Sequence, residues 1–253
     1  MARPCRLVTK RCITCLVVVV ALSAAAPVMA GPPYVTDDPE PTNTGGWENY
    51  LYVTGTNTPG DTEEEAGIEL NYGAAPDLQL SASLPIDYDH VDGYRFGGGD
   101  IDLGAKYRFV HQSPDSWLPD VAIFPSVSLL TAARTLGPQH LSLFLPLWME
   151  KDFGAWSTFG GGGYTINPGD GNRDYQLFGW AVARTITSRL NIGVEVYHQT
   201  ASVVHGKSLT NIALGFVFQI SKHFALMASG GPGVESPAKS ERSAFYASIQ
   251  YVN

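Results

Sequence analysis

The chain has 253 residues, 16% charged residues, 44% hydrophobic residues and a formal net charge of −8. The charged share is low compared with the roughly 25% of an average soluble domain. The acidic balance argues against nucleic-acid binding, which needs a basic face to meet phosphates. The aromatic share of 11% and the evenly spread apolar residues argue against a disordered chain.

Residues 1–30 have the pattern of a secretory signal peptide. Four basic residues come first, and residues 13–26 then form an apolar run that is too short for a comfortable transmembrane helix. Val28 and Ala30 place small residues directly before Gly31, as a signal-peptidase site requires. We therefore expect export with cleavage between Ala30 and Gly31; an uncleaved N-terminal anchor helix is the alternative.

Removal of this segment makes the chain more acidic and free of cysteine. Residues 1–30 carry four basic and no acidic side chains, so the remaining 223 residues have a net charge of −12. Cys5, Cys12 and Cys15 all lie in the predicted signal peptide. The mature chain therefore has no disulfide, no thiolate metal site and no cysteine nucleophile.

The mature chain divides into an N-terminal segment and a strand-rich region. Residues 31–46 are rich in proline and acidic residues; we expect them to lie in the periplasm and to plug part of the lower opening. From residue 47 onward, short segments alternate apolar and polar residues with a period of two, as in residues 100–109. No apolar run there reaches the roughly 18 residues of a transmembrane helix. We expect strands that begin near residues 47, 66, 78, 100, 121, 140, 156, 175, 190, 208, 224 and 243.

The predicted connections alternate in length, as in outer-membrane barrels with short periplasmic turns and long outer loops. The short ones are residues 74–77, 153–155, 187–189 and 221–223. The long ones are residues 57–65, 89–99, 131–139, 167–174, 199–207 and 231–242, and residues 111–120 are long where a short turn is due. The pattern predicts an all-β protein, a closed antiparallel up-and-down transmembrane β-barrel of about 12 strands over residues 47–253.

Each strand of such a barrel turns one face to lipid and the other to the lumen, whereas a soluble sandwich buries its apolar face against a second sheet. We expect the pore-lining side chains to be Glu69, Asn71, Gln79, Asp100, Asp102, Lys106, Arg108, Glu150, Arg184 and Glu195. Interface girdles are expected at the periplasmic strand ends from Trp47, Tyr50, Tyr72, Tyr107, Phe109, Phe153, Trp156, Phe224 and Tyr251, and at the outer ends from Tyr88, Tyr164, Tyr175 and Tyr197.

Three prolines, Pro85, Pro125 and Pro146, fall inside predicted strands. Proline has no N–H to donate to a ladder, so each should mark a bulge or a rim position.

Several segments of the mature chain together resemble the outer-membrane transporters grouped as the "MetA-pathway of phenol degradation" family. These segments are residues 31–41, 69–80, 99–109, 144–148, 160–169 and 195–200, and the similarity extends over nearly the whole mature chain. The resemblance implies passage of small, often aromatic or apolar, compounds across the outer membrane of Gram-negative bacteria. It carries over no functional residue.

Two oxygen-rich patterns are weak candidates for metal sites. Asp170, Asn172 and Asp174 have the spacing of a calcium loop, but Tyr175 stands where that loop needs glycine, which favours a solvated turn. Asp100 and Asp102 share a face with Lys106 and Arg108, which can neutralise them. We expect no metal and no cofactor.

The expected function is an outer-membrane channel or facilitated transporter for small molecules, without catalytic residues. Its partners are outer-membrane lipid, a small-molecule solute and the barrel-assembly machinery, and not nucleic acid. One alternative is a hydrolase of outer-membrane phospholipase type, because His140 and Ser142 share one strand face. The other is a closed structural or adhesive barrel. The sequence gives neither the solute nor the oligomeric state.

Overall fold

The computed structural model describes residues 33–89, 95–132, 140–238 and 240–253. In this part of the chain, no helix is long and apolar enough to cross a membrane. The regular elements are β1 (Trp47–Thr58), β2 (Asp61–Ala75), β3 (Leu78–Asp89), β4 (Arg95–Gly98), β5 (Asp102–Val110), β6 (Asp120–Ile123), β7 (Ser126–Ser128), β8 (Ser142–Phe153), β9 (Trp156–Ile166), β10 (Tyr175–Thr187), β11 (Leu190–Gln199), β12 (Leu209–Gln219), β13 (Phe224–Pro232) and β14 (Ser243–Val252).

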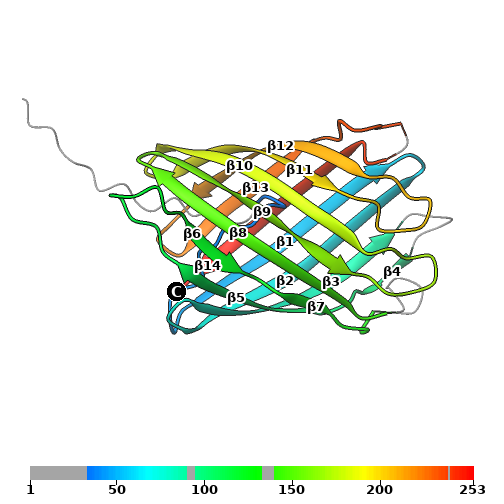
Figure 1. Cartoon of the computed structure of the whole chain (residues 1–253), viewed down its shortest axis with the longest axis horizontal. Helices are drawn as coiled ribbons and strands as arrows, with labels where there is room; N and C mark the ends of the chain where they lie inside the picture. Colours follow the sequence, from blue (N-terminus) through cyan, green and yellow to red (C-terminus); the bar gives the residue numbers. More distant parts are fainter. Residues whose placement is uncertain (1–32, 90–94, 133–139, 239) are drawn as a thin grey trace, which may run out of the picture.

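The strands form one closed antiparallel wall (Figure 1). Strands β1 and β14 pair from Glu48↔Val252 to Asn57↔Ser243, which joins the two ends of the sheet. Strands β4 and β5 both pair with β3, and strands β6 and β7 both pair with β5 and β8, so each of these couples occupies a single position. The 14 labelled strands therefore make a twelve-stranded barrel, which confirms the predicted fold class.

The two ends of the barrel differ in their connections. One end carries the C-terminus and the short connections 76–77, 154–155, 188–189 and 220–223, and we name it the turn end (Figure 1). The other end carries most long connections and is named the loop end. The long loop expected at residues 57–65 is wrong, because the β1–β2 ladder continues to Thr58↔Asp61. Gly60, with a φ of +93°, lets the chain turn there within two residues.

Side chains alternate between the two faces of the wall. On β1, Leu51 is 61% exposed, whereas its neighbours Tyr50 and Tyr52 are buried in the interior. Most aromatic residues expected in the girdle at the turn end are half exposed on the outer face, namely Trp47, Tyr72, Tyr107, Phe109, Phe153, Trp156, Phe224 and Tyr251. Tyr50, Tyr175 and Tyr197 do not belong to the girdles. All three occupy inward positions of their strands; Tyr50 and Tyr197 are buried, and Tyr175 lines an interior cavity.

The three strand prolines lie at two interruptions of the wall, between β4 and β5 and between β6 and β7. The carbonyl of Pro85 accepts the N–H of Gly99 at 3.0 Å, so the edge of Pro85 that lacks a donor faces the first interruption. Pro125 lies within the second interruption. Pro146 faces the same interruption from β8, since its carbonyl accepts the N–H of Phe124 at 3.3 Å. None of the prolines lies at a rim, and the missing donors account for the gaps.

Residues 33–46 run inside the barrel, from about half its depth to the turn end. The start of this segment lies beside Ser229 and Glu195, which are near the middle of β13 and β11. Thr36 is completely buried and Asp38 is 3% exposed. The segment therefore lies within the barrel and not below it, and it occupies the turn-end half of the lumen in the manner of the expected partial plug. It fills the half of the interior next to the turn end, where the wall has charged side chains that bind it and enough space to hold it.

Candidate functional site

The barrel interior brings together most of the predicted pore-lining residues. Interior side chains are contributed by Glu69 and Asn71 on β2, Gln79 on β3, Asp102, Lys106 and Arg108 on β5, Glu150 on β8 and Glu195 on β11. Alternation along each strand places them there. Whether they line a path for solutes remains a prediction.

Arg184 was predicted on the interior and lies on the outer face instead. Its guanidinium carbon lies 5.0 Å from the ring centre of Trp156, which is itself 48% exposed on the outer face of β9. Its neighbours on β10, Ala181 and Ala183, are the buried inward residues. The prediction treated Arg184 as inward because it is charged, but the alternation of β10 turns it outward.

Asp100 lies in the interruption between β4 and β5 and lines neither of the two main interior cavities. Its Oδ1 accepts the N–H groups of Thr131 at 2.9 Å and Ala132 at 2.8 Å. This carboxylate therefore fastens the chain that follows β7 at the loop end.

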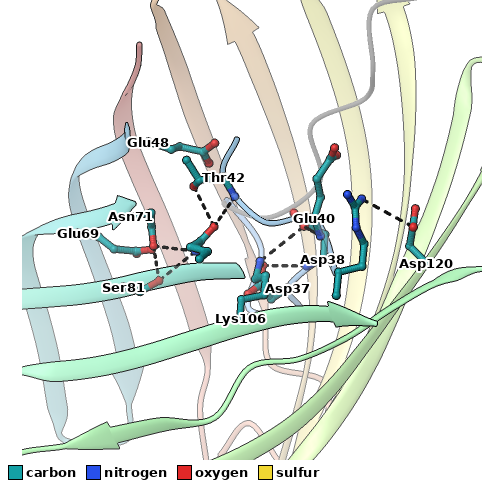
Figure 2. A network of polar contacts seen from close by, with 12 residues as sticks. Asp37, Asp38, Glu40, Thr42, Glu48, Glu69, Asn71, Ser81, Lys106 and Asp120 are labelled. Atoms are coloured by element: carbon teal, nitrogen blue, oxygen red, sulfur yellow. Dashed lines mark hydrogen bonds and ion pairs between the residues drawn. The ribbon is translucent and has the colours of Figure 1, made fainter. Parts of the chain in front are cut away.

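Lys106 holds the N-terminal segment by its charge. Its Nζ lies 3.1 Å from Oδ1 of Asp37 and 3.6 Å from Oδ1 of Asp38, and its side chain is 5% exposed (Figure 2). A buried ammonium group without a carboxylate partner would be costly, so these contacts tie the segment to β5.

Glu195 binds the backbone of the same segment. Its carboxylate accepts the N–H of Val35 at 3.2 Å and the N–H of Thr36 at 2.5 Å. On the opposite side, the hydroxyl of Ser229 donates to the carbonyl of Pro33 at 2.5 Å. Backbone groups in an interior that lack a strand partner must be satisfied by side chains, and Glu195 and Ser229 do so for Pro33, Val35 and Thr36.

Glycines on neighbouring strands make room for the segment. A Cβ atom at Gly179 would lie 2.0 Å from Oγ1 of Thr36, and a Cβ atom at Gly215 would lie 2.8 Å from the ring of Tyr34. Gly193, on the strand between them, would meet the hydroxyl of Tyr34 at 2.5 Å. These three inward glycines of β10, β11 and β12 form a furrow, which we name the glycine furrow.

A polar cluster fixes the segment near the turn end. Oε1 of Gln79 accepts the N–H of Thr42 at 2.7 Å and its hydroxyl at 2.9 Å (Figure 2). Nε2 of Gln79 donates to Asn71 at 2.9 Å and to Ser81 at 3.0 Å. Close beside it, Arg108 binds Asp77 at 3.0 Å and Asp120 at 3.7 Å.

Two of the interior cavities border the segment on opposite sides. The turn-side chamber has a volume of about 310 Å³, and Glu48, Asn253 and Lys106 are among its lining residues. The loop-side chamber has a volume of about 480 Å³. Its walls combine hydroxyl groups, aromatic rings and carboxylates, from Ser81, Ser83, Ser126, Ser128, Ser142, Thr165, Tyr52, Phe124, Phe144, Trp148, Tyr175, Tyr246, Asp37, Glu65, Glu69 and Asp102.

The interior is strongly acidic. Among strand residues whose side chains the structure describes, only Lys106 and Arg108 are basic and face inward, and both are paired with carboxylates. Within the described residues, several inward acids are bound by neutral groups: Glu65 accepts the hydroxyl of Tyr52, and Asp102 accepts that of Ser128. The potential in the loop-side chamber therefore favours cations over anions.

The alternative sites proposed from the sequence do not assemble in the described residues. These contain no group of three or more His, Cys, Asp or Glu side chains that could hold a metal ion. Nδ2 of Asn172, part of the calcium-like pattern, donates to the carbonyl of Pro168 at 3.0 Å within its own turn. Ser142 lines the loop-side chamber from within the barrel, while a lipase residue of this kind must meet lipid from outside.

Sequence reasoning missed Tyr34, Thr36, Asp37 and Asp38 as partners of the interior face. A usable signal was present in Lys106, an inward lysine whose same-face carboxylate on β5, Asp102, lies four residues away and is too distant for an ion pair. The second signal was glycine at inward positions of three consecutive strands, because such a patch leaves room for another chain segment.

No protein-family model matches the chain, and no curated protein sequence matches it. Among solved structures, the COG4313 outer membrane channel from Pseudomonas putida F1 is similar with a TM-score of 0.68 at 13% sequence identity, over 85% of this chain and 97% of that one. The KdgM porin, solved in complex with disordered oligogalacturonate, has a TM-score of 0.56 at 8% identity, over 81% and 98% of the two chains. These similarities show that the chain has the fold of outer-membrane barrels.

Proposed function

We propose that the mature chain is an outer-membrane channel or facilitated transporter for small molecules, aromatic and apolar ones among them. The observation that carries the proposal is a closed wall that is apolar outside and encloses two polar chambers. A soluble barrel of this kind would expose a continuous apolar belt to water, at a large free-energy cost. In lipid, the belt is covered and the closed ladder leaves no edge unpaired.

The proposal extends to the cellular location of the protein and to its family. After removal of residues 1–30, with cleavage between Ala30 and Gly31, the barrel enters the outer membrane of a Gram-negative cell with the help of the barrel-assembly machinery. The turn end then faces the periplasm and the loop end faces outward. Membership of the "MetA-pathway of phenol degradation" family is supported by the sequence resemblance. Water solubility of the purified mature protein without detergent would contradict this assignment.

The chamber chemistry favours neutral or positively charged solutes. Rings such as Phe144 and Trp148 suit an aromatic or apolar body, and the serine hydroxyls can bind its polar groups. The KdgM complex contains an oligogalacturonate, which is a polyanion. An acidic interior whose two basic side chains are already engaged disfavours such a solute.

Transport is tested by reconstituting the mature protein into liposomes and planar bilayers. Swelling with a panel of phenols, fatty acids, nucleosides and sugars should identify the solute class. Substitution of Asp102, Lys106 or Arg108 should change the conductance, because these side chains face the interior. A protein that neither conducts ions nor admits any solute, with residues 31–46 present or deleted, is a closed structural barrel.

We propose no catalytic step. Ser142→Ala should leave any lipid hydrolysis measured in proteoliposomes unchanged, and a loss of such activity would favour the hydrolase alternative. Ser142 is instead expected to act in solute passage, as one of the hydroxyl groups of the loop-side chamber.

A further inference from the structure

One connection at the turn end is longer than the others and carries two exposed apolar side chains. Residues 111–119 join β5 to β6, and we name them the rim loop. Trp117 is 87% exposed and Leu118 is 52% exposed. Trp117 is thus the most exposed large hydrophobic side chain in the described part of the protein.

The rim loop is fastened to the end of β8. Nζ of Lys151 donates to the carbonyl of Ser113 at 2.8 Å and to that of Leu118 at 3.2 Å. The side chain of Gln112 donates to the carboxylate of Asp152 at 2.9 Å and accepts its N–H at 3.0 Å. The loop therefore holds Trp117 in a defined place at the rim.

That place is continuous with the outer face of the wall. The ring centre of Trp117 lies 6.1 Å from that of Phe153, which is half exposed at the end of β8. Phe153 pairs with Trp156 on β9, whose ring contacts Arg184. Aromatic rings and two basic side chains of the outer face, Lys151 and Arg184, thus meet in one patch at the turn end.

We propose that Trp117 and Leu118 insert into the headgroup region of the phospholipid leaflet at the turn end and anchor the rim loop there. The inference rests on the proposed membrane location of the barrel. Tryptophan favours this region because its ring is apolar while its N–H remains hydrated. The basic groups of Lys151 and Arg184 complement lipid phosphates at the same depth. If the rim loop faced water, an exposed indole beside the apolar outer face of the barrel would not stabilise the loop.

The mature chain lacks cysteine, so single cysteines can carry a fluorescent label whose environment is measured. The test variant is Trp117→Cys. Asp115→Cys reports on the same loop away from the apolar pair, Lys222→Cys serves as the water reference, and Leu51→Cys as the lipid reference. Each labelled protein is folded into vesicles of phosphatidylethanolamine and phosphatidylglycerol. Quenching by aqueous iodide is compared with quenching by lipids spin-labelled near the headgroup or near the chain end.

We expect the label at residue 117 to be quenched several-fold less by iodide than the labels at residues 115 and 222. Headgroup-labelled lipid should quench it more strongly than chain-end-labelled lipid. Iodide quenching equal to that at residue 222, or no quenching by either agent, would overturn the proposal, since the residue would then face water or a protein surface. Iodide access at residue 51 would instead show that the barrel itself is not in lipid.

A second measurement avoids the label. In vesicles with lipids brominated near the headgroup, Trp117→Phe should lower the quenched share of the intrinsic tryptophan fluorescence relative to the unsubstituted protein. An unchanged quenched share would also overturn the proposal.

Discussion

Lys106 forms two ion-pair contacts with the acidic N-terminal segment, to the carboxylates of Asp37 and Asp38. The next basic side chain along β5, Arg108, is bound to Asp77 and Asp120 instead. The placement of the segment should therefore depend strongly on Lys106.

Lys106→Gln should release the segment and raise the single-channel conductance. Loss of one partner from a buried ion pair typically costs about 3–5 kcal/mol, because the remaining charges stay buried without compensation. Planar-bilayer recordings measure the effect. Arg184→Gln is the matched control, since that side chain lies on the outer face and should leave the conductance unchanged. Equal conductance of Lys106→Gln and the unsubstituted protein would show that the ion pair does not hold the segment.

Glu235 should make one connection at the loop end, between β13 and β14, sensitive to acid. Hydrogen bonds from Thr210 at 2.6 Å and Ser208 at 3.0 Å lower the pKa of this carboxyl group, and His198 lies 3.2 Å away. A lowered pKa in the folded state stabilises the loop above the ordinary carboxyl pKa, and this contribution is lost as pH falls through the lowered value. The rate of amide hydrogen exchange of residues 233–238, corrected for the intrinsic effect of pH, should therefore rise at acidic pH.

Glu235→Gln tests that account, because a glutamine does not titrate. The exchange rates of this variant, corrected for the intrinsic effect of pH, should be high and independent of pH. A variant that keeps the acid-dependent acceleration would show that another group is responsible.

The alternation of apolar and polar residues along the sequence predicts the strands better than the other elements. Alternate residues of β3, β5 and β11 face inward as expected, and the starts of nearly all strands agree with the pattern. The prediction was wrong at Arg184, which was placed inward although the alternation along β10 turns it outward. It also gave no sign that β1 and β2 continue past residue 57, because the acidic residues Glu63, Glu64 and Glu65 resemble a loop.

The glycine furrow offers a test at the level of elements. Gly179→Ala places a methyl group where Thr36 lies, so it should displace the segment and raise the conductance. Thr36→Gly removes Oγ1 and Cβ of Thr36, which are the two atoms nearest to the added methyl group. The double variant should therefore regain the original conductance. Failure of the second substitution to compensate would show that the methyl group acts on the wall itself and not through the segment.

The fold of the whole molecule could be predicted from the sequence, and the path of residues 33–46 could not. Strand number and closure follow from a periodic pattern that each segment carries in itself. The interior segment has no such period: its place depends on Lys106, Glu195 and Ser229, which come from three distant strands. Pairings of that kind appear only when the wall is closed.

The charge of the whole interior should make the open barrel prefer cations. Recordings in a salt gradient should give a reversal potential of the sign expected for cation selectivity, and the double substitution Glu65→Gln and Asp102→Asn should reduce it. Asp115→Asn, in the rim loop outside the lumen, is the control and should leave the potential unchanged. Anion selectivity of the unsubstituted protein would contradict the electrostatic account of the interior.

The pairing of β1 with β14 has a consequence for how the protein can be made. These are the first and the last strands of the barrel, so the ring stays open until β14 has been placed beside β1. A product that stops before Ser243 would lack the seam entirely and leave the edges of two strands bare in the bilayer. Loss of so few residues would then abolish assembly altogether, whereas a globular protein often tolerates a shortened tail.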